Sequence, residues 1–145
     1  MRAVIQTVSQ AEVKVAGEII GQISKGYLVL LAIHAADDDD KITKMADKIA
    51  DLRIFTDADD KMNLSLKDVG GEVLLISQFT LYGDTKRGNR PSFIDSARPD
   101  KAIPMYEKII ELLKEKGLKV ATGRFGAMMS VSLVNEGPTT IIIDL

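Results

Sequence analysis

The chain has 145 residues, of which 46% are hydrophobic and 28% are charged, a balance typical of a globular protein with one domain. Its formal net charge of -2 excludes the Lys and Arg excess of a general nucleic-acid or membrane coat, but it leaves room for a local basic patch. The lack of cysteine excludes disulfides, thiolate nucleophiles and cysteine-rich zinc sites, and the single histidine, His34, cannot hold a metal alone, so we expect no metal and no cofactor.

The start of the chain does not have the pattern of an export signal. Residues 1–8, MRAVIQTV, lack the long apolar segment and the small-residue cleavage site of a signal peptide. No uninterrupted apolar run approaches the ~20 residues of a membrane span. We therefore expect a cytoplasmic protein without a membrane partner.

The first part of the chain is predicted to form strands. Residues 1–15 are rich in β-branched side chains with partial alternation, residues 18–23 continue the pattern, and Ala16-Gly17 between them suits a tight turn. This pattern predicts a β-hairpin. Residues 26–35, GYLVLLAIHA, form a nearly continuous apolar run, which predicts a central strand that is covered on both faces.

Two amphipathic helices are predicted further along. The first lies within residues 41–55, and the aspartates at 37–40 before it are expected to be a solvated helix cap, because acidic residues favour a helix start. The second lies within residues 97–117 and ends at Gly117. Two strands, 128–137 and 139–145, are then expected to close a single α+β domain over residues 1–145.

The stretch LLISQFTLYG, residues 74–83, begins as an apolar strand and then becomes polar. Ser77, Gln78 and Thr80 stand where a strand would normally continue to pack, and the stretch has no His, Cys, Asp or Glu to activate a hydroxyl. These side chains either satisfy backbone groups at a strand end or bind a ligand, and composition does not choose between the two. His34 has no partner identifiable in the sequence and is expected to be a dispensable packed or surface histidine.

Three other features have both a plain and a functional interpretation. The polar loop 83–93 contains Lys86, Arg87 and Arg90, which either bind phosphates or are ordinary solvated charges. Pro138 after Gly137 is by itself typical of a turn. The aspartates at 57, 59 and 60 lack the pattern of a calcium loop and are expected to be solvated.

Two motifs together resemble the D-aminoacyl-tRNA deacylase family. SQFTL at 77–81 matches one family signature, and NEGPTT at 135–140 is close to the other, N-x-G-P-V-T. RIFTDADDKMN, GGEVL, RGNRPSF, PDKAIPMYE and TGRFGAMM resemble family segments in the same order and spacing, so the resemblance covers nearly the whole chain. Thr139 replaces the usual Val. Thr7 replaces an Arg that helps to hold the Gly-Pro turn in related proteins, which leaves open what holds that turn here.

The resemblance implies a homodimeric hydrolase with a barrel-like, largely antiparallel sheet and two main helices. It would cleave the ester between a D-amino acid, or glycine, and the 3′-terminal ribose of tRNA, as chiral proofreading in translation. The backbone N–H groups of Phe79 and Thr80 can stabilise an oxyanion, Ser77 and Gln78 would shape the adenosine end, and the 2′-hydroxyl of the substrate would help to activate water. Thr80 as a covalent nucleophile is the rival mechanism.

The resemblance also assigns residues outside the first motif. The carbonyls of Gly137 and Pro138, joined by a cis bond, would enter the site of the partner subunit and exclude L side chains by collision. Ala102 and Met129, together with Phe79, match positions that line the family's pocket. Lys86, Arg87 and Arg90 are candidates for phosphate contacts at the acceptor end of the tRNA.

A noncatalytic interpretation stays open beside the enzyme. The chain could be an oligomeric protein that binds a nucleotide or the tRNA end on the same scaffold without turnover. Its few aromatic residues argue against a general platform for stacking single-stranded bases. Deacylation of D-Tyr-tRNA compared with L-Tyr-tRNA would distinguish the enzyme from the binder.

Overall fold

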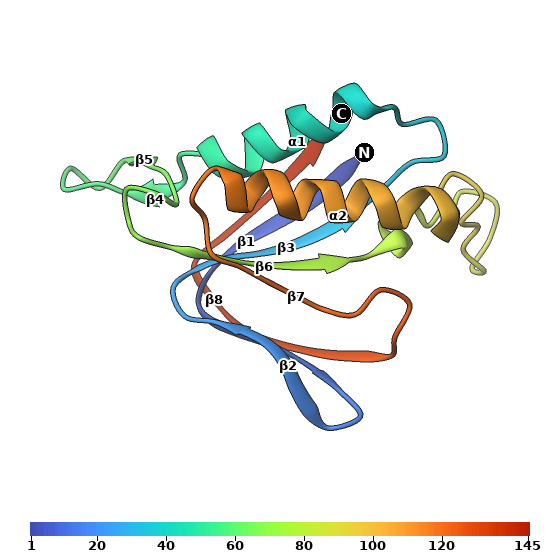
Figure 1. Ribbon diagram of the computed structural model, residues 1–145, viewed down its shortest axis with the longest axis horizontal. Coiled ribbons are helices and arrows are strands. Elements are labelled where there is room, and N and C mark those ends of the chain that lie inside the picture. The colour runs from blue at the N-terminus through green and yellow to red at the C-terminus, as the bar shows by residue number, and fades with distance from the viewer.

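A computed structural model describes residues 1–145 as two helices packed on one face of a curved β-sheet (Figure 1). The helices α1, Asp39–Asp51, and α2, Pro99–Glu115, lie side by side. The sheet contains β1 Arg2–Val15, β2 Glu18–Ile23, β3 Gly26–Ala32, β6 Glu72–Ser77, β7 Val120–Thr122 and β8 Met129–Asp144. A separate hairpin contains β4 Phe55–Thr56 and β5 Met62–Leu64, and the 3₁₀ helix η1, Phe79–Tyr82, follows β6.

The sheet is mixed, which corrects the expectation of a largely antiparallel one. Its strand order is β2-β1-β3-β6-β7, with β8 pairing β1. β1 is antiparallel to β2, β3 and β8, whereas β3 pairs β6 and β6 pairs β7 in parallel. The parallel pairs follow from α1 and α2, because each helix belongs to the crossover that joins the two strands of a pair.

The turn and helix-end signals in the sequence are confirmed. Ala16 and Gly17 have φ values of 51° and 82°, the positive values that a two-residue hairpin turn requires, and β1 and β2 pair across them. β3 pairs on both edges and is almost entirely buried, as predicted for a central strand. α2 ends before Gly117, whose φ of 87° stops the helix.

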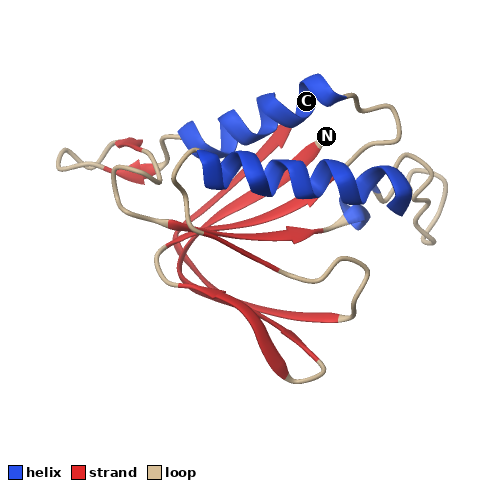
Figure 2. Cartoon of the chain, viewed as in Figure 1, coloured by secondary structure: helices blue, strands red, loops and turns tan.

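The sheet curls toward a barrel on the face opposite the helices (Figure 2). The larger core cluster lies between the helices and β1, β3 and β6, and a smaller cluster fills the inside of the curl. The curl brings β2 so close to β7 that a Cβ at Gly21 would lie 2.6 Å from the Thr122 carbonyl oxygen. Glycine at this position therefore permits the nearly closed, barrel-like shape. No helix is both long and apolar enough to cross a membrane.

The expectation of a solvated cap before α1 is wrong for Asp37. Its side chain is fully buried and accepts hydrogen bonds from the Met1 ammonium at 2.7 Å, the Lys41 Nζ at 2.9 Å and the His34 N–H at 2.7 Å. Burial alone would raise the pKa of Asp37, but these three donors outweigh it and lower the pKa below its ordinary value. Asp37 is thus part of the core, while the three aspartates that follow it are exposed as predicted.

Candidate active site

The SQFTL motif lies where β6 leaves the sheet. β3 and β6 run in parallel with Leu31 beside Ser77, and the N–H of Gln78 donates to the Leu31 carbonyl at 2.8 Å. The chain then turns into η1 at the carboxyl end of both strands (Figure 1). The carboxyl ends of parallel strands are a frequent location of binding sites.

The η1 turn leaves two backbone donors without partners in the turn. The Leu81 N–H donates to the Gln78 carbonyl at 3.2 Å, and the Gly83 N–H donates to the Thr80 carbonyl at 2.9 Å. Phe79 and Thr80 are the first residues of the helix, so their own N–H groups have no acceptor one turn earlier. Two neighbouring N–H groups are therefore available to a ligand.

The side chains of the motif are suited to binding rather than to proton abstraction. Phe79 and Thr80 are exposed, whereas Ser77 and Gln78 are half-buried. Gln78 Nε2 donates a hydrogen bond to Thr80 Oγ1, and this amide is a donor, not a base. No group of three or more His, Cys, Asp or Glu side chains is arranged to hold a metal.

His34 lies beside the turn and is packed, as expected. Its ring meets the Tyr82 ring edge-on with centroids 5.1 Å apart, and its Nδ1 accepts a hydrogen bond from the Ala36 N–H at 3.0 Å. These contacts give the imidazole a structural role next to η1.

Two residues that sequence reasoning missed support the turn from the loop before α2. The Phe93 ring packs edge-on against Phe79 at 5.2 Å, and Ser96 Oγ donates to the Phe79 carbonyl at 2.8 Å. Phe93 stands in RGNRPSF, which was recognised only as a family-like segment. Nothing in the local pattern indicated its partner, since the contact joins residues that are distant in the sequence.

The other two predicted pocket residues lie on opposite sides of the sheet. Ala102 of α2 belongs to the core between helices and sheet, whereas Met129 at the start of β8 packs against the cluster inside the curl. The Met129 Sδ lies 2.5 Å from the position of a Cβ at Gly123, so a larger residue there would displace the Met129 side chain. The substrate-binding role of Ala102 and Met129 stays a prediction.

The polar loop 83–93, called the basic loop from here on because it carries Lys86, Arg87 and Arg90, begins directly after η1. Asp84 and Ser92 exchange backbone hydrogen bonds at 2.8 and 2.9 Å and close the loop at its base. Lys86, Arg87 and Arg90 are exposed, and none of them forms an ion pair within the chain. Their charges are therefore free to meet an anion near the motif.

The second motif forms a loop within β8. The structure has one strand here instead of the two predicted, but its pairing with β1 is interrupted: Val8 pairs with Asn135 and Gln6 pairs with Thr140. Residues 136–139 thus bulge away opposite Thr7, and the Gly137-Pro138 peptide bond is cis. We call residues 136–139 the Gly-Pro loop.

The two motifs of one chain are far apart. Thr7, opposite the Gly-Pro loop, pairs with Tyr27, whereas Ser77 pairs with Leu31. Those four steps along β3 correspond to about 13 Å, and the three strand spacings from β8 to β6 add about 14 Å across the sheet. One chain by itself does not bring SQFTL and Gly137-Pro138 into one site.

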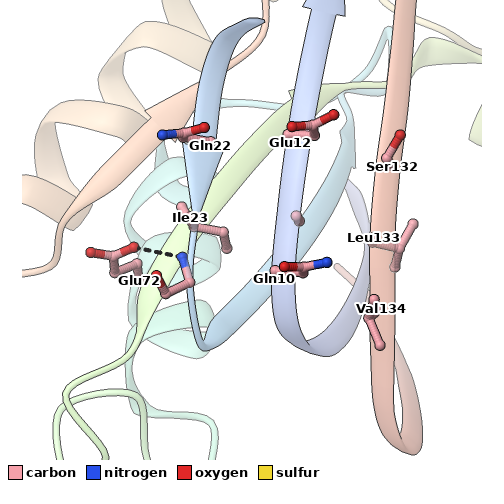
Figure 3. Close-up of a pocket in the computed structure, with 10 residues that line it drawn as sticks. Gln10, Glu12, Gln22, Ile23, Glu72, Ser132, Leu133 and Val134 are labelled. Carbon is pink, nitrogen blue, oxygen red and sulfur yellow. Dashed lines mark hydrogen bonds between the residues drawn. The ribbon is translucent and has the colours of Figure 1, made fainter.

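None of the four main cavities is lined by a residue of the SQFTL motif. The largest, about 670 Å³, lies between β1, β2 and β8, and Glu12 and Glu72 make it unsuited to phosphate (Figure 3). Its Glu72 carboxylate already accepts a hydrogen bond from the Ser24 N–H at 3.0 Å. Another cavity, of about 410 Å³, lies beside the Gly-Pro loop and is lined by Gly137, Lys25 and Phe55, among others. The cavities of the single chain therefore do not identify the η1 turn as a binding site.

Comparison with known proteins decides the family. The model of the family described as D-Tyr-tRNA(Tyr) deacylase matches residues 4–144. The chain belongs to this family. A D-aminoacyl-tRNA deacylase of Thermotoga petrophila is 55% identical over 144 residues, which cover 99% of this chain and 97% of the relative.

Two further proteins widen the comparison. A Bacillus subtilis protein named inactive D-aminoacyl-tRNA deacylase is 57% identical over 127 residues, covering 88% of this chain and 96% of its own. A solved structure titled c-Myc DNA Unwinding Element Binding Protein superposes with a TM-score of 0.93 at 37% identity, covering 100% of this chain and 99% of its own. The fold is thus shared by proteins whose names differ.

Proposed function

We propose that this deacylase-family chain hydrolyses the ester that joins a D-amino acid, or glycine, to the 3′-terminal ribose of tRNA. It acts as a homodimer in which the Gly-Pro loop of one subunit completes the site at η1 of the other. Such an enzyme removes D-amino acids from tRNA while it spares L-aminoacyl-tRNA. Because this substrate belongs to translation, we propose that the chain acts in the cytoplasm.

The chemistry suits a site that has no protein base. An aminoacyl ester is already activated, because its leaving group is a ribose hydroxyl that has a second hydroxyl beside it. The substrate's own 2′-hydroxyl can therefore assist the attacking water. The protein has to position the ester and to stabilise the charge that develops on its carbonyl oxygen. Backbone groups and neutral side chains can do both.

The available N–H groups of Phe79 and Thr80 are the observation that carries the catalytic proposal. They belong to consecutive residues at the start of η1, directly after β6, and neither has an acceptor one turn earlier. Directed at the developing oxyanion, each such donor contributes typically ~3 kcal/mol to catalysis. Gln78 holds the Thr80 hydroxyl, which supports a role for Thr80 in orientation and not as a nucleophile.

The distance between the motifs supports the proposed dimer. The Gly-Pro loop lies opposite Thr7, level with the start of β3, whereas η1 lies beyond the end of β3, so a site that uses both needs two chains. In the dimer, the loop carbonyls of the partner stand beside the substrate's α-carbon and collide with an L side chain. Glycine has no side chain and passes this filter together with D-amino acids.

Activity is tested with D-Tyr-tRNA, L-Tyr-tRNA and glycyl-tRNA. We expect hydrolysis of the first and third and little hydrolysis of the second. A D-Tyr-tRNA that ends in 2′-deoxyadenosine, with the amino acid on the 3′ position, should react about 10²-fold or more slowly if its hydroxyl acts in proton transfer. A normal rate on the deoxy substrate would exclude substrate assistance.

Mixed dimers test the exchange of loops between subunits. A chain with Gln78→Ala and Thr80→Ala keeps its loop, and a chain with Gly137→Ala keeps its η1. Gly137 has a φ of 115°, and a Cβ there would lie 2.7 Å from Thr139 Oγ1, so the substitution displaces the loop. A mixed dimer then has one site with both parts intact and should regain selective deacylation. No gain over the parent dimers would mean that the loop does not act across the interface.

A noncatalytic binder of the tRNA end is the second candidate. The relative named inactive deacylase shares 57% identity with this chain, so similarity of sequence also extends to a protein named as lacking the activity. A binder would retain D-Tyr-tRNA on the dimer without releasing tyrosine. Measuring tyrosine release and tRNA retention in one experiment therefore separates the two functions.

A further inference from the structure

Thr7 is one of only two polar or charged residues that are buried in this chain, the other being Asp37. Asp37 is held in an ion cluster at the start of α1. Thr7 instead lies in the middle of β1, at the position where β8 leaves the ladder and forms the Gly-Pro loop. A buried hydroxyl at the base of a loop needs a partner, since an unpaired one is costly.

Two hydrogen bonds connect Thr7 and Asn135 to the Gly-Pro loop, and a third joins these two residues to each other. Thr7 Oγ1 donates to the Glu136 carbonyl at 2.5 Å. Asn135 Nδ2 donates to the Thr7 carbonyl at 2.9 Å and to the Thr139 carbonyl at 3.0 Å. The bonds thus hold both ends of the Gly-Pro loop, where the β1–β8 ladder offers it no pairing.

We propose that Thr7 and Asn135 are positioning residues for stereochemical selection. We call this pair of residues the brace. It fixes Glu136 and Thr139, which flank Gly137 and Pro138, so the two carbonyls between them are held from both sides. This inference rests on the function proposed above, in which those carbonyls exclude L side chains from the partner's site.

Loss of the brace should change the selectivity for D- over L-aminoacyl-tRNA more than the rate on the D substrate. Exclusion by collision works only if the obstructing atoms stay in place, and functional groups generally need to be held within about 0.5 Å. Without the Thr7 hydroxyl, the Glu136 carbonyl loses its buried donor and one end of the loop is released. An L side chain then displaces the loop more easily, while the N–H groups of η1 in the same site are unchanged.

Two substitutions at one position test the brace. Thr7→Val removes the hydroxyl but keeps a branched shape suited to a buried strand, and Thr7→Ser keeps the hydroxyl. Both dimers are assayed on D-Tyr-tRNA and L-Tyr-tRNA beside Gly137→Ala, and their thermal unfolding is recorded. We expect Thr7→Val to lower the D-to-L ratio of kcat/KM about tenfold, the effect of one lost hydrogen bond, and Thr7→Ser to restore it.

The outcomes separate the brace from the proposed function. A merely structural Thr7 would lower Tm and both rates together, with an unchanged ratio. An unchanged ratio in Thr7→Val beside a lowered ratio in Gly137→Ala would overturn the brace and leave the proposed function intact. An unchanged ratio in Gly137→Ala would overturn the role of the loop, and the brace with it.

A substitution in β8 tests the brace independently, in case the Thr7→Val chain does not fold. Asn135→Asp keeps the shape of the side chain but replaces its donating NH₂ group by an acceptor, which opposes the carbonyls of Thr7 and Thr139. The same fall in the D-to-L ratio is expected. A folded Asn135→Asp dimer with full selectivity would overturn the brace.

Discussion

Two polar regions at the same end of the sheet differ in how many of their hydrogen-bonding groups have a partner within the chain. Around Asp37, which follows β3, one carboxylate accepts hydrogen bonds from three donors and is fully buried. Around η1, which follows β6, exposed side chains and two N–H groups have capacity left for a ligand. The first arrangement serves the fold, and the second has the unused donors that a binding site needs.

Asp37→Asn should disturb the first region most. Removing one partner of a buried ion pair costs about 3–5 kcal/mol, because the remaining charge is left without compensation. We expect the free energy of unfolding to fall by about this amount in urea denaturation. The matched control is Asp39→Asn, an exposed residue whose replacement should change stability by at most ~0.5 kcal/mol. Equal effects of the two substitutions would contradict a structural role for the cluster.

Acid should weaken the same region. The pKa of Asp37 is lowered in the folded chain relative to its ordinary value of 3.8, so the folded state binds its proton less readily than the unfolded state does. The stabilisation is therefore present above this ordinary value and is lost as the pH falls through the lowered pKa. Thermal unfolding measured from about pH 6 down to about pH 2 should show a smaller acid loss in Asp37→Asn than in the original chain. Parallel curves would assign the acid loss to other groups.

Local sequence patterns predicted the elements well, because each depends on neighbouring residues. The turn at Ala16-Gly17, the buried β3 and the end of α2 at Gly117 all follow from side-chain period and backbone freedom. The parallel pairing of β3 with β6 was not predicted, since the spacing of hydrophobic residues along a strand does not specify which strand it pairs with.

The sequence predicted the motif of the candidate site but not the residues that hold the motif in place. Ser77–Leu81 stood out because polar residues replaced packing ones, and the structure places this motif at a strand end. The contacts of Phe93 and Ser96 with Phe79, and of Thr7 with Glu136, join residues that are distant in the sequence. The burial of Asp37 likewise depends on the amino group of Met1, which no local pattern brings near it.

Thr80→Ala should reduce function and leave stability unchanged. The Thr80 side chain is exposed, so the free energy of unfolding should change by at most ~0.5 kcal/mol. The loss of one hydrogen bond at the site should lower kcat/KM on D-Tyr-tRNA about tenfold. Thr85→Ala, in the adjoining loop, serves as the control. Acid quenching should trap no acyl-enzyme in the original chain, and an ester on Thr80 found by mass spectrometry would instead support the nucleophile mechanism.

The basic loop should contribute a modest, salt-dependent part of tRNA affinity. Each phosphate contact on a single strand contributes about -0.7 to the slope of log affinity against log salt, so Arg87→Ala should make the slope shallower by about that amount. The control Lys44→Ala removes an exposed, unpaired lysine on α1 and should leave the slope unchanged. An unchanged slope in Arg87→Ala would exclude Arg87 from the phosphate contacts.

His34→Gln should have the smallest effect, although His34 lies beside the candidate site. A general base contributes typically 10²–10⁴-fold to a rate, whereas loss of the ring contact with Tyr82 and of the hydrogen bond from the Ala36 N–H should change kcat/KM by less than about tenfold. Its neighbour Tyr82 does not replace it as a base, because burial raises the pKa of Tyr82 to about 12 and keeps its hydroxyl protonated near neutral pH. Single-turnover rates on D-Tyr-tRNA measure the effect on the chemical step. A loss of 10²-fold in a folded His34→Gln dimer would make His34 the proton acceptor and remove the need for the substrate's 2′-hydroxyl.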